Sequence, residues 1–185
     1  YNDKAQVNIL KEALHNAGAK VIDIPLSQEG VLGFSNIHLT LKKDYEDFAS
    51  IYDLPVKTLD NLITLNSKDK DKNAKYGQDY LEEAAKTAIT SSDEISKSIE
   101  KAASLLETAF KENGLDGIAF LNSTASTLPA AAGFPELTIP LGKDKNGVPQ
   151  GATLTVPSGE DETLLKMGYS FQEYTKGRIY PLGTP

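Results

Sequence analysis

The sequence contains no cysteine, so disulfide bonds, thiolate nucleophiles and thiolate metal ligands are excluded. Histidine is scarce. His15 and His38 are the two in the chain, and neither has a neighbour at a spacing typical of a metal site. Arg178 is the single arginine, so no guanidinium precedes the last few residues to bind a carboxylate or phosphate through two hydrogen bonds. We therefore expect no metal ion, no other cofactor and no phosphoryl-transfer chemistry.

Excess positive charge and long apolar runs are also missing. The chain has 19 basic and 26 acidic residues and a net charge of −7, which argues against a surface that follows a nucleic-acid backbone. No apolar run reaches the roughly 18 residues that a membrane-spanning helix needs. Leucine, isoleucine, valine and phenylalanine make up 46 of the 185 residues, above the range of disordered chains. We expect one compact domain over residues 1–185, with neither a nucleic acid nor a membrane as partner; the compartment stays open.

Apolar residues recur at helical spacing in six segments, which predicts helices over residues 4–17, 37–53, 58–66, 78–87, 91–114 and 160–175. Thr58 is expected to cap the third helix, and Ser91 with Glu94 forms a capping box for the fifth. Gly18, Gly114 and Gly177 are expected to end helices. The charged run 67–73 is expected to be a solvated loop.

Short apolar segments predict strands over residues 20–24, 117–121, 137–141 and 152–156. The last two are expected to pair through a nine-residue loop, 142–150, that contains Asn146-Gly147. Helices alternating with strands indicate an α/β fold. We expect a mixed β-sheet with helices on both faces, in which the late hairpin forms an antiparallel pair.

A search for a nucleophile finds no catalytic residue. Ser91-Ser92 is the one pair of adjacent serines, but no glycine flanks it to expose a hydroxyl on a strained turn, and helix capping explains both side chains. His15 and His38 lie near predicted helix ends, where structural or surface roles are expected.

The segment Asn122-Ser123-Thr124-Ala125-Ser126-Thr127 is a hydroxyl-rich loop that follows a predicted strand. Ligands of α/β folds bind beyond the carboxyl ends of strands, so this loop is a candidate pocket lining. The alternative is a polar loop whose hydroxyls bond to their own backbone.

Residues 130–142, AAAGFPELTIPLG, followed by NGVPQG at 146–151, resemble the C-terminal region of amidase signature enzymes. That region typically has an Ala-Gly-aromatic-Pro turn, a strand that ends in Pro-x-Gly, a glycine-containing loop, and a second Pro-x-Gly that opens the next strand. Residues 18–22, 58–63 with Asn66, 76–78 and 164–175 extend the resemblance, which is greatest to bacterial peptide-amidase-like members.

The resemblance implies that residues 1–185 are the C-terminal portion of an amidase signature domain whose catalytic N-terminal portion is absent. Enzymes of this family cleave C–N amide bonds with a Ser, cis-Ser, Lys triad in a Gly/Ser-rich segment, and no such segment occurs here. The chain alone is therefore expected to be inactive. Its implied partners are the missing portion and a small-molecule or peptide amide substrate, with one pocket wall formed by Asn122, Ser123, Thr124, Ser126, Thr127 and Phe134.

Two alternatives remain open. The chain could be a binding or interaction module that reuses the scaffold without chemistry, or it could be related to the glutamyl-tRNA amidotransferase A subunit, which this region also resembles. In that branch an arginine is expected to hold the carboxylate of glutamine, and the lack of arginine before Arg178 favours a neutral amide instead. A sheet cut from its neighbouring strands would expose unpaired edges, so the isolated chain is expected to self-associate.

Overall fold

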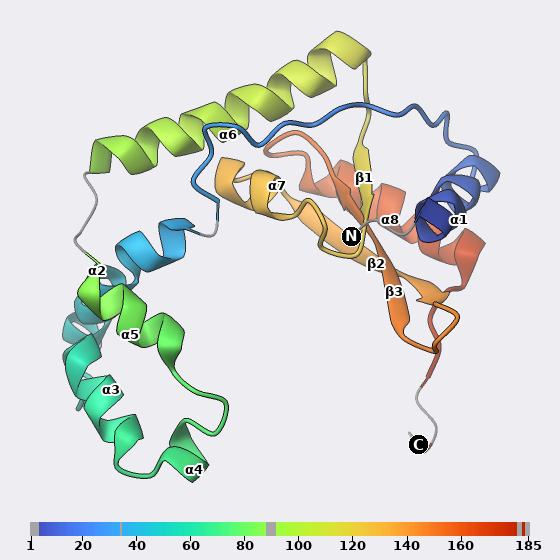
Figure 1. Cartoon of the computed structure of the whole chain (residues 1–185). Helices are drawn as coiled ribbons and strands as arrows, with labels where there is room; N and C mark the ends of the chain where they lie inside the picture. The colour runs from blue at the N-terminus through green and yellow to red at the C-terminus, as the bar shows by residue number, and fades with distance from the viewer. Residues whose placement is uncertain (1–3, 34, 88–91, 181–182, 184–185) are drawn as a thin grey trace. The chain divides into compact units, whose positions relative to one another are not determined.

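The computed structural model describes residues 4–33, 35–87, 92–180 and 183, and it divides into two compact units (Figure 1). Unit 1 comprises Tyr1–Val31 and Ser98–Pro185, and unit 2 comprises Leu32–Lys97. The elements in chain order are α1 (Lys4–Asn16), α2 (Ser35–Ile51), α3 (Leu59–Ser67), α4 (Lys70–Asn73), α5 (Asp79–Lys86), α6 (Ser92–Asn113), β1 (Ile118–Leu121), α7 (Thr127–Ala132), β2 (Glu136–Lys143), β3 (Pro149–Thr155) and α8 (Asp161–Thr175). The six predicted helices are confirmed, with ends shifted by a few residues. Ser91 of the predicted capping box lies outside the described residues.

The sheet of unit 1 has three strands in the order β1-β3-β2. β3 is central and pairs antiparallel with both neighbours, so that Thr155 lies opposite Ile118 on one side and Glu136 on the other. The predicted pairing of 137–141 with 152–156 is confirmed. The predicted mixed sheet is wrong, because all ladders among the described strands are antiparallel and the parallel contact of Leu141 with Gly177 is an isolated bridge.

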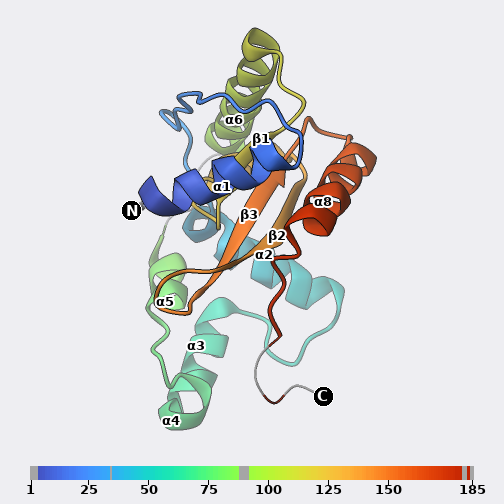
Figure 2. The ribbon, with the colours of Figure 1, turned by 90° about the vertical axis from the view of Figure 1, so that its right-hand side faces the viewer.

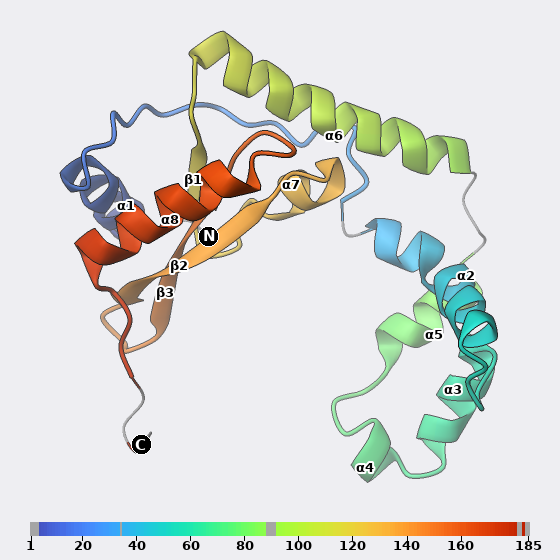
Figure 3. The same ribbon diagram turned by 180° about the vertical axis from the view of Figure 1, so that it is seen from behind.

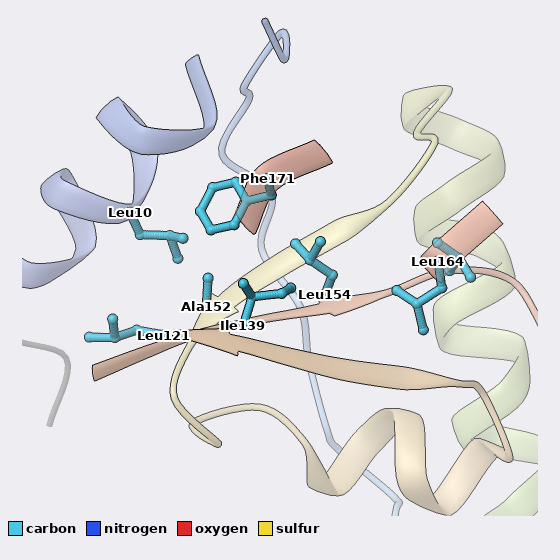
Figure 4. Close-up of a cluster of buried hydrophobic side chains, with 8 residues drawn as sticks. Leu10, Leu121, Ile139, Ala152, Leu154, Leu164 and Phe171 are labelled. Carbon is cyan, nitrogen blue, oxygen red and sulfur yellow. The ribbon is translucent and has the colours of Figure 1, made fainter. Parts of the chain in front are cut away.

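Helices cover both faces of this sheet, as predicted. The first face packs against α1 and α8, which Figures 2 and 3 show on the same side of the strands. Figure 4 shows Leu10 of α1 and Phe171 of α8 directed toward the strand residues. The cluster consists of Leu10, Leu121, Ile139, Ala152, Leu154, Val156, Leu164 and Phe171. A second cluster joins α6 and α7 to β1 and contains Ala102, Leu106, Ala109, Phe110, Ile118, Leu128 and Phe134.

The predicted strand at 20–24 is wrong. These residues are irregular, and no strand in the described part of the chain pairs with them. A strand is stable only as part of a ladder, which satisfies its backbone N–H and C=O groups. The side chain of Ile24 still packs against the second cluster, while Ile22 is 46% exposed. The apolar pattern therefore indicated correctly that part of the segment is buried. It did not show that the segment lacks a neighbouring strand to pair with.

The hairpin between β2 and β3 has a shorter loop than the predicted nine residues, because the strands extend to Lys143 and Pro149. Asp144 closes the turn. Its backbone N–H donates to Val148 O at 2.9 Å, and its Oδ1 accepts from the N–H groups of Asn146 and Val148, each at 2.8 Å. This is an Asx-type turn, in which the aspartate side chain replaces backbone pairing.

Gly177 does not end α8 as predicted. Lys176 takes the left-handed conformation, with φ of 46°, and its N–H donates to Gln172 O. Gly177 lies directly against β2, where a Cβ would be 2.3 Å from Pro140 O. The glycine is required here by a close backbone approach, while the helix ends at Thr175 with Lys176 as its left-handed cap.

Unit 2 contains α2, α3, α4 and α5. Thr58 caps α3 as predicted, since its side chain accepts from Asn61 N. The run 67–73 is not all loop, because Asp69 accepts from Lys72 N and starts the single turn of α4. Gln78 joins α3 to α5: its Nε2 donates to Ser67 Oγ at 3.0 Å and to Ile63 O at 3.3 Å, and its Oε1 accepts from Asn66 Nδ2 at 3.2 Å.

We predict that Gly168→Ala destabilises unit 1. Gly168 is buried where α8 crosses β2, and a Cβ there would lie 2.3 Å from Leu137 Cδ2. Alanine favours a helix over glycine, but relief of this overlap must displace a packed core side chain, which costs about 1–3 kcal/mol. Denaturant unfolding followed by circular dichroism measures the change. The control is Ser170→Ala on the exposed side of α8, which should leave the unfolding midpoint unchanged or slightly raised. A G168A variant as stable as S170A would contradict the packing.

Candidate functional site

The candidate segment 122–127 consists of the loop between β1 and α7 and the first residue of that helix, Thr127. It begins at Asn122, whose φ of 52° places a residue other than glycine in the left-handed region. Asparagine tolerates this conformation better than most residues because its short polar side chain bonds to nearby backbone. The chain therefore turns sharply where β1 ends.

Asn122 also joins β1 to β3 beyond the last ladder pair. Its backbone N–H donates to Gly151 O at 2.7 Å, and its side-chain Oδ1 accepts from Gly151 N at 2.7 Å. Its Nδ2 donates to Gln150 Oε1 at 2.9 Å, and its backbone O accepts from the hydroxyl of Thr153. Gly151 is also closely packed against β2, where a Cβ would lie 2.7 Å from Thr138 Cγ2. Asn122 has a scaffold role in this chain.

The hydroxyls of the loop fall into two groups. Thr124 donates to Leu121 O at 2.8 Å, and the hydroxyl of Ser126 acts on the carboxyl of Glu136, whose pKa it lowers. Ser123 is exposed, Thr127 is half-buried, and neither side chain makes a hydrogen bond within the part of the chain that the structure describes. Ser123 and Thr127 are thus the loop hydroxyls available to a ligand, and the pocket lining stays a prediction for all of these residues.

Phe134, also predicted to line the pocket, follows α7 and is buried in the second apolar cluster. Its ring stacks on Phe110 of α6, with centroids 6.2 Å apart. In this chain the phenylalanine anchors α7 to α6. It lies between α7 and β2, at the opposite end of α7 from the loop.

The second face of the sheet carries a group of polar side chains that the motif search missed. Alternation along paired strands places Glu136, Thr138, Thr153 and Thr155 on this face. Thr138 Oγ1 and Thr153 Oγ1 are 2.8 Å apart. Burial raises the pKa of the Glu136 carboxyl, and the hydrogen bond from Ser126 opposes that shift. The alternation of polar and apolar residues in Glu136-Leu137-Thr138-Ile139 was the signal available in the sequence.

The remaining candidates do not gather at this loop. His38 belongs to unit 2, stacks on Tyr80 at 5.4 Å and has its Nδ1 3.9 Å from Glu83 Oε2. His15 is exposed near the end of α1. Across the described residues, no group of three or more histidine, aspartate or glutamate side chains is arranged to hold a metal ion. Likewise, none of the described helices combines the length and apolar character needed to cross a membrane.

Comparison with known proteins gives a consistent result. No family model matches the chain. An amidase family protein of Bacillus anthracis aligns over 97% of this chain with a TM-score of 0.87 and 32% identity. A probable amidase of Arabidopsis thaliana is 28% identical over 138 residues, 69% of this chain. This chain is related to the amidase signature family over nearly its whole length.

A third protein has a similar structure. The peptide amidase of Stenotrophomonas maltophilia covers 97% of this chain with a TM-score of 0.79 and 22% identity. The chain spans only part of each relative: 37% of the Bacillus protein, 42% of the Stenotrophomonas peptide amidase and 26% of the Arabidopsis protein. The structure described here therefore corresponds to part of the amidase signature fold.

We predict that Asn122→Ala destabilises unit 1 by about 2–4 kcal/mol, because it leaves the Gly151 N–H without its partner and places alanine at positive φ. Asn122→Gly separates the two effects, since glycine accepts the left-handed conformation and loses only the side-chain bonds. Urea unfolding of the three proteins should rank wild type above N122G, and N122G above N122A. Equal midpoints for wild type and N122A would show that the Asn122–Gly151 contact contributes nothing.

Proposed function

We propose that this chain is the C-terminal portion of an amidase that hydrolyses a carboxylic amide to an acid and ammonia or an amine. The observation that carries the proposal is the 32% identity and TM-score of 0.87 with an amidase family protein over 97% of this chain. In this proposal the Ser, cis-Ser and Lys residues that break the bond belong to polypeptide outside residues 1–185.

The requirements of serine-based amide hydrolysis support placing the catalytic residues outside this chain. Amide hydrolysis through a serine needs a base to take the hydroxyl proton and donors to stabilise the oxyanion. The sequence has no adjacent serines flanked by glycine, and Ser91-Ser92 is followed by two acidic residues. In the loop, the hydroxyl of Thr124 already bonds to Leu121 O. These residues form a framework without an activated nucleophile.

The contribution of the chain to substrate binding is one wall of the pocket. Ser123 and Thr127 supply hydroxyls, and Asn122, Thr124, Ser126 and Phe134 fix the loop that carries them. A neutral amide suits this surface better than glutamine. The sole arginine, Arg178, lies over the ring of Tyr180 at 5.5 Å and belongs to the C-terminal tail, away from the loop in sequence.

The direct test is a chimera in which this chain replaces the matching segment of the Bacillus anthracis protein. We expect the chimera to hydrolyse neutral amides that the Bacillus protein accepts, because the framework is retained and the catalytic residues come from the host. We expect the purified 185-residue chain to release no ammonia or amine from the same panel, to which glutamine is added. Turnover is measured by detection of the released product.

Ser123→Ala in the chimera tests the pocket wall. Loss of one hydrogen bond to substrate is worth about 1 kcal/mol, so KM should rise about fivefold with kcat little changed. Ser170→Ala is the matched control on the exposed side of α8. Amide turnover by the chain alone would contradict the proposal, and so would a folded chimera that binds amides without hydrolysing them, as a binding module would.

We propose further that the isolated chain self-associates. β1 and β2 are the edge strands of the described sheet, and α8 exposes Leu165 and Tyr169, 62% and 68% accessible and one helical turn apart. Light scattering should give a mass above 20.0 kDa, and an anilinonaphthalene dye should bind. The double variant L165E/Y169E should lower both signals. A monodisperse monomer that binds no dye would contradict the proposal.

A further inference from the structure

The sequence contains two Asn-Gly pairs, Asn113-Gly114 and Asn146-Gly147. In such a pair the backbone nitrogen of the glycine can attack the side-chain amide of the asparagine, because glycine has no side chain to hinder the approach. Both pairs are exposed to water in the fold. Any difference in their reactivity must therefore come from how the structure holds each pair.

The first pair lies at the end of α6. Asn113 is the last residue of this helix, and its side-chain Nδ2 donates to Ala109 O at 2.9 Å. Gly114 takes the left-handed conformation, with φ of 60°, and the N–H of Leu115 donates to Phe110 O at 3.0 Å, a pattern that closes helix ends. Phe110 belongs to the second apolar cluster. Release of Asn113 therefore requires the helix end to unravel beside a buried ring.

The second pair lies at the tip of the hairpin between β2 and β3. Gly147 N–H donates to Asp144 O at 3.0 Å, and Gly147 has φ of 81°, a combination typical of a short hairpin loop that ends in a left-handed glycine. The Asp144 carboxylate accepts from the backbone N–H groups of Asn146 and Val148. Within the described residues, the Asn146 side chain makes no hydrogen bond and the hairpin tip belongs to neither apolar cluster. The second pair can therefore be released by a local opening that leaves both cores packed.

We propose that Asn146 is a deamidation site of this chain and that Asp144 sets its rate by keeping the hairpin tip closed. In the reaction the Gly147 nitrogen gives its proton to a solvent base and bonds to Asn146 Cγ. The Cγ–Nδ2 bond breaks, and the amide nitrogen takes a proton from water and leaves as ammonia. Water then opens the cyclic imide at either of its two carbonyls, which gives aspartate or isoaspartate. One water is consumed and one ammonia is released.

The closed tip slows the first of these steps. The Gly147 nitrogen can attack only when it turns toward Asn146 Cγ, whereas in the turn its N–H points to Asp144 O. An intramolecular attack is fast once the reacting atoms are aligned, so the fraction of time that the tip is open sets the rate. Deamidation does not depend on the proposed function, because its atoms come from this chain and water. It releases at most one ammonia from Asn146 of each chain, whereas turnover of an added amide releases its product repeatedly.

The test is incubation of the folded 185-residue chain in mildly alkaline buffer. Peptide mapping by mass spectrometry then locates each amide that has become a carboxyl and separates the isoaspartyl peptides. The same chain in concentrated guanidinium chloride is the reference, since both Asn-Gly pairs are unfolded there and should react at similar rates. In the folded chain we expect Asn146 to react severalfold faster than Asn113 and severalfold more slowly than in guanidinium.

Two variants isolate the contribution of Asp144. Asp144→Ala removes the acceptor of the Asn146 and Val148 N–H groups and should raise the rate at Asn146 severalfold, toward the rate in guanidinium. Asp144→Asn keeps an Oδ1 acceptor but removes the negative charge, and Asn146 should then react as slowly as in wild type. In both variants an unchanged rate at Asn113 shows that α6 and the fold around it are intact.

Three results would overturn the proposal. The first is a folded wild type in which Asn146 stays intact or reacts no faster than Asn113. The second is an equal rate at Asn146 in wild type and D144A. The third is a D144N variant as fast as D144A, because the charge of Asp144 rather than its hydrogen bonds would then control the reaction.

Discussion

The central strand β3 is the constraint on which the rest of unit 1 depends. Residues 151–155 of this strand are buried, and both edge strands bond to it. Its apolar side chains, Ala152 and Leu154, meet α1 and α8, while its threonines face the opposite side. The same strand also fixes the candidate loop. Gly151 O accepts from the backbone N–H of Asn122, and Gly151 N donates to the side-chain Oδ1 of Asn122. A shift of one residue in its register would exchange the two faces and separate Asn122 from Gly151.

Local chemistry explains why most elements could be predicted from the sequence. Thr58 caps α3 through its own hydroxyl, and the apolar spacing of residues 160–175 matches a helix on the sheet. The wrong predictions for residues 20–24 and for Gly177 have a common physical cause. The structure at both places depends on contacts with residues distant in sequence. Residues 20–24 have strand composition but no strand beside them in the described chain. Gly177 reads as a helix stop, but it is required by the backbone of Pro140, 37 positions earlier.

One part of the candidate site could likewise be predicted from the sequence, and another part could not. The position of loop 122–127 after a strand could be predicted, because strand ends are where α/β folds place ligands. Which side chains of the loop already have partners could not be predicted, since those of Asn122 come from β3, about 30 residues later in the chain. Glu136 was missed because a single carboxyl within a strand matches no motif, although its alternation with Thr138 marks a polar face. In the proposed function this chain is framework, and the side-chain bonds of Asn122 to β3 support that proposal.

Covalent labelling by a fluorophosphonate, which reacts with activated serine nucleophiles, tests that central claim most directly. The chimera with the Bacillus anthracis protein serves as the positive control, and intact-mass spectrometry with peptide mapping locates the adduct. The account predicts one adduct in the chimera, on a serine of the host segment, and an unchanged mass for the 185-residue chain. An adduct on any serine of this chain would contradict it.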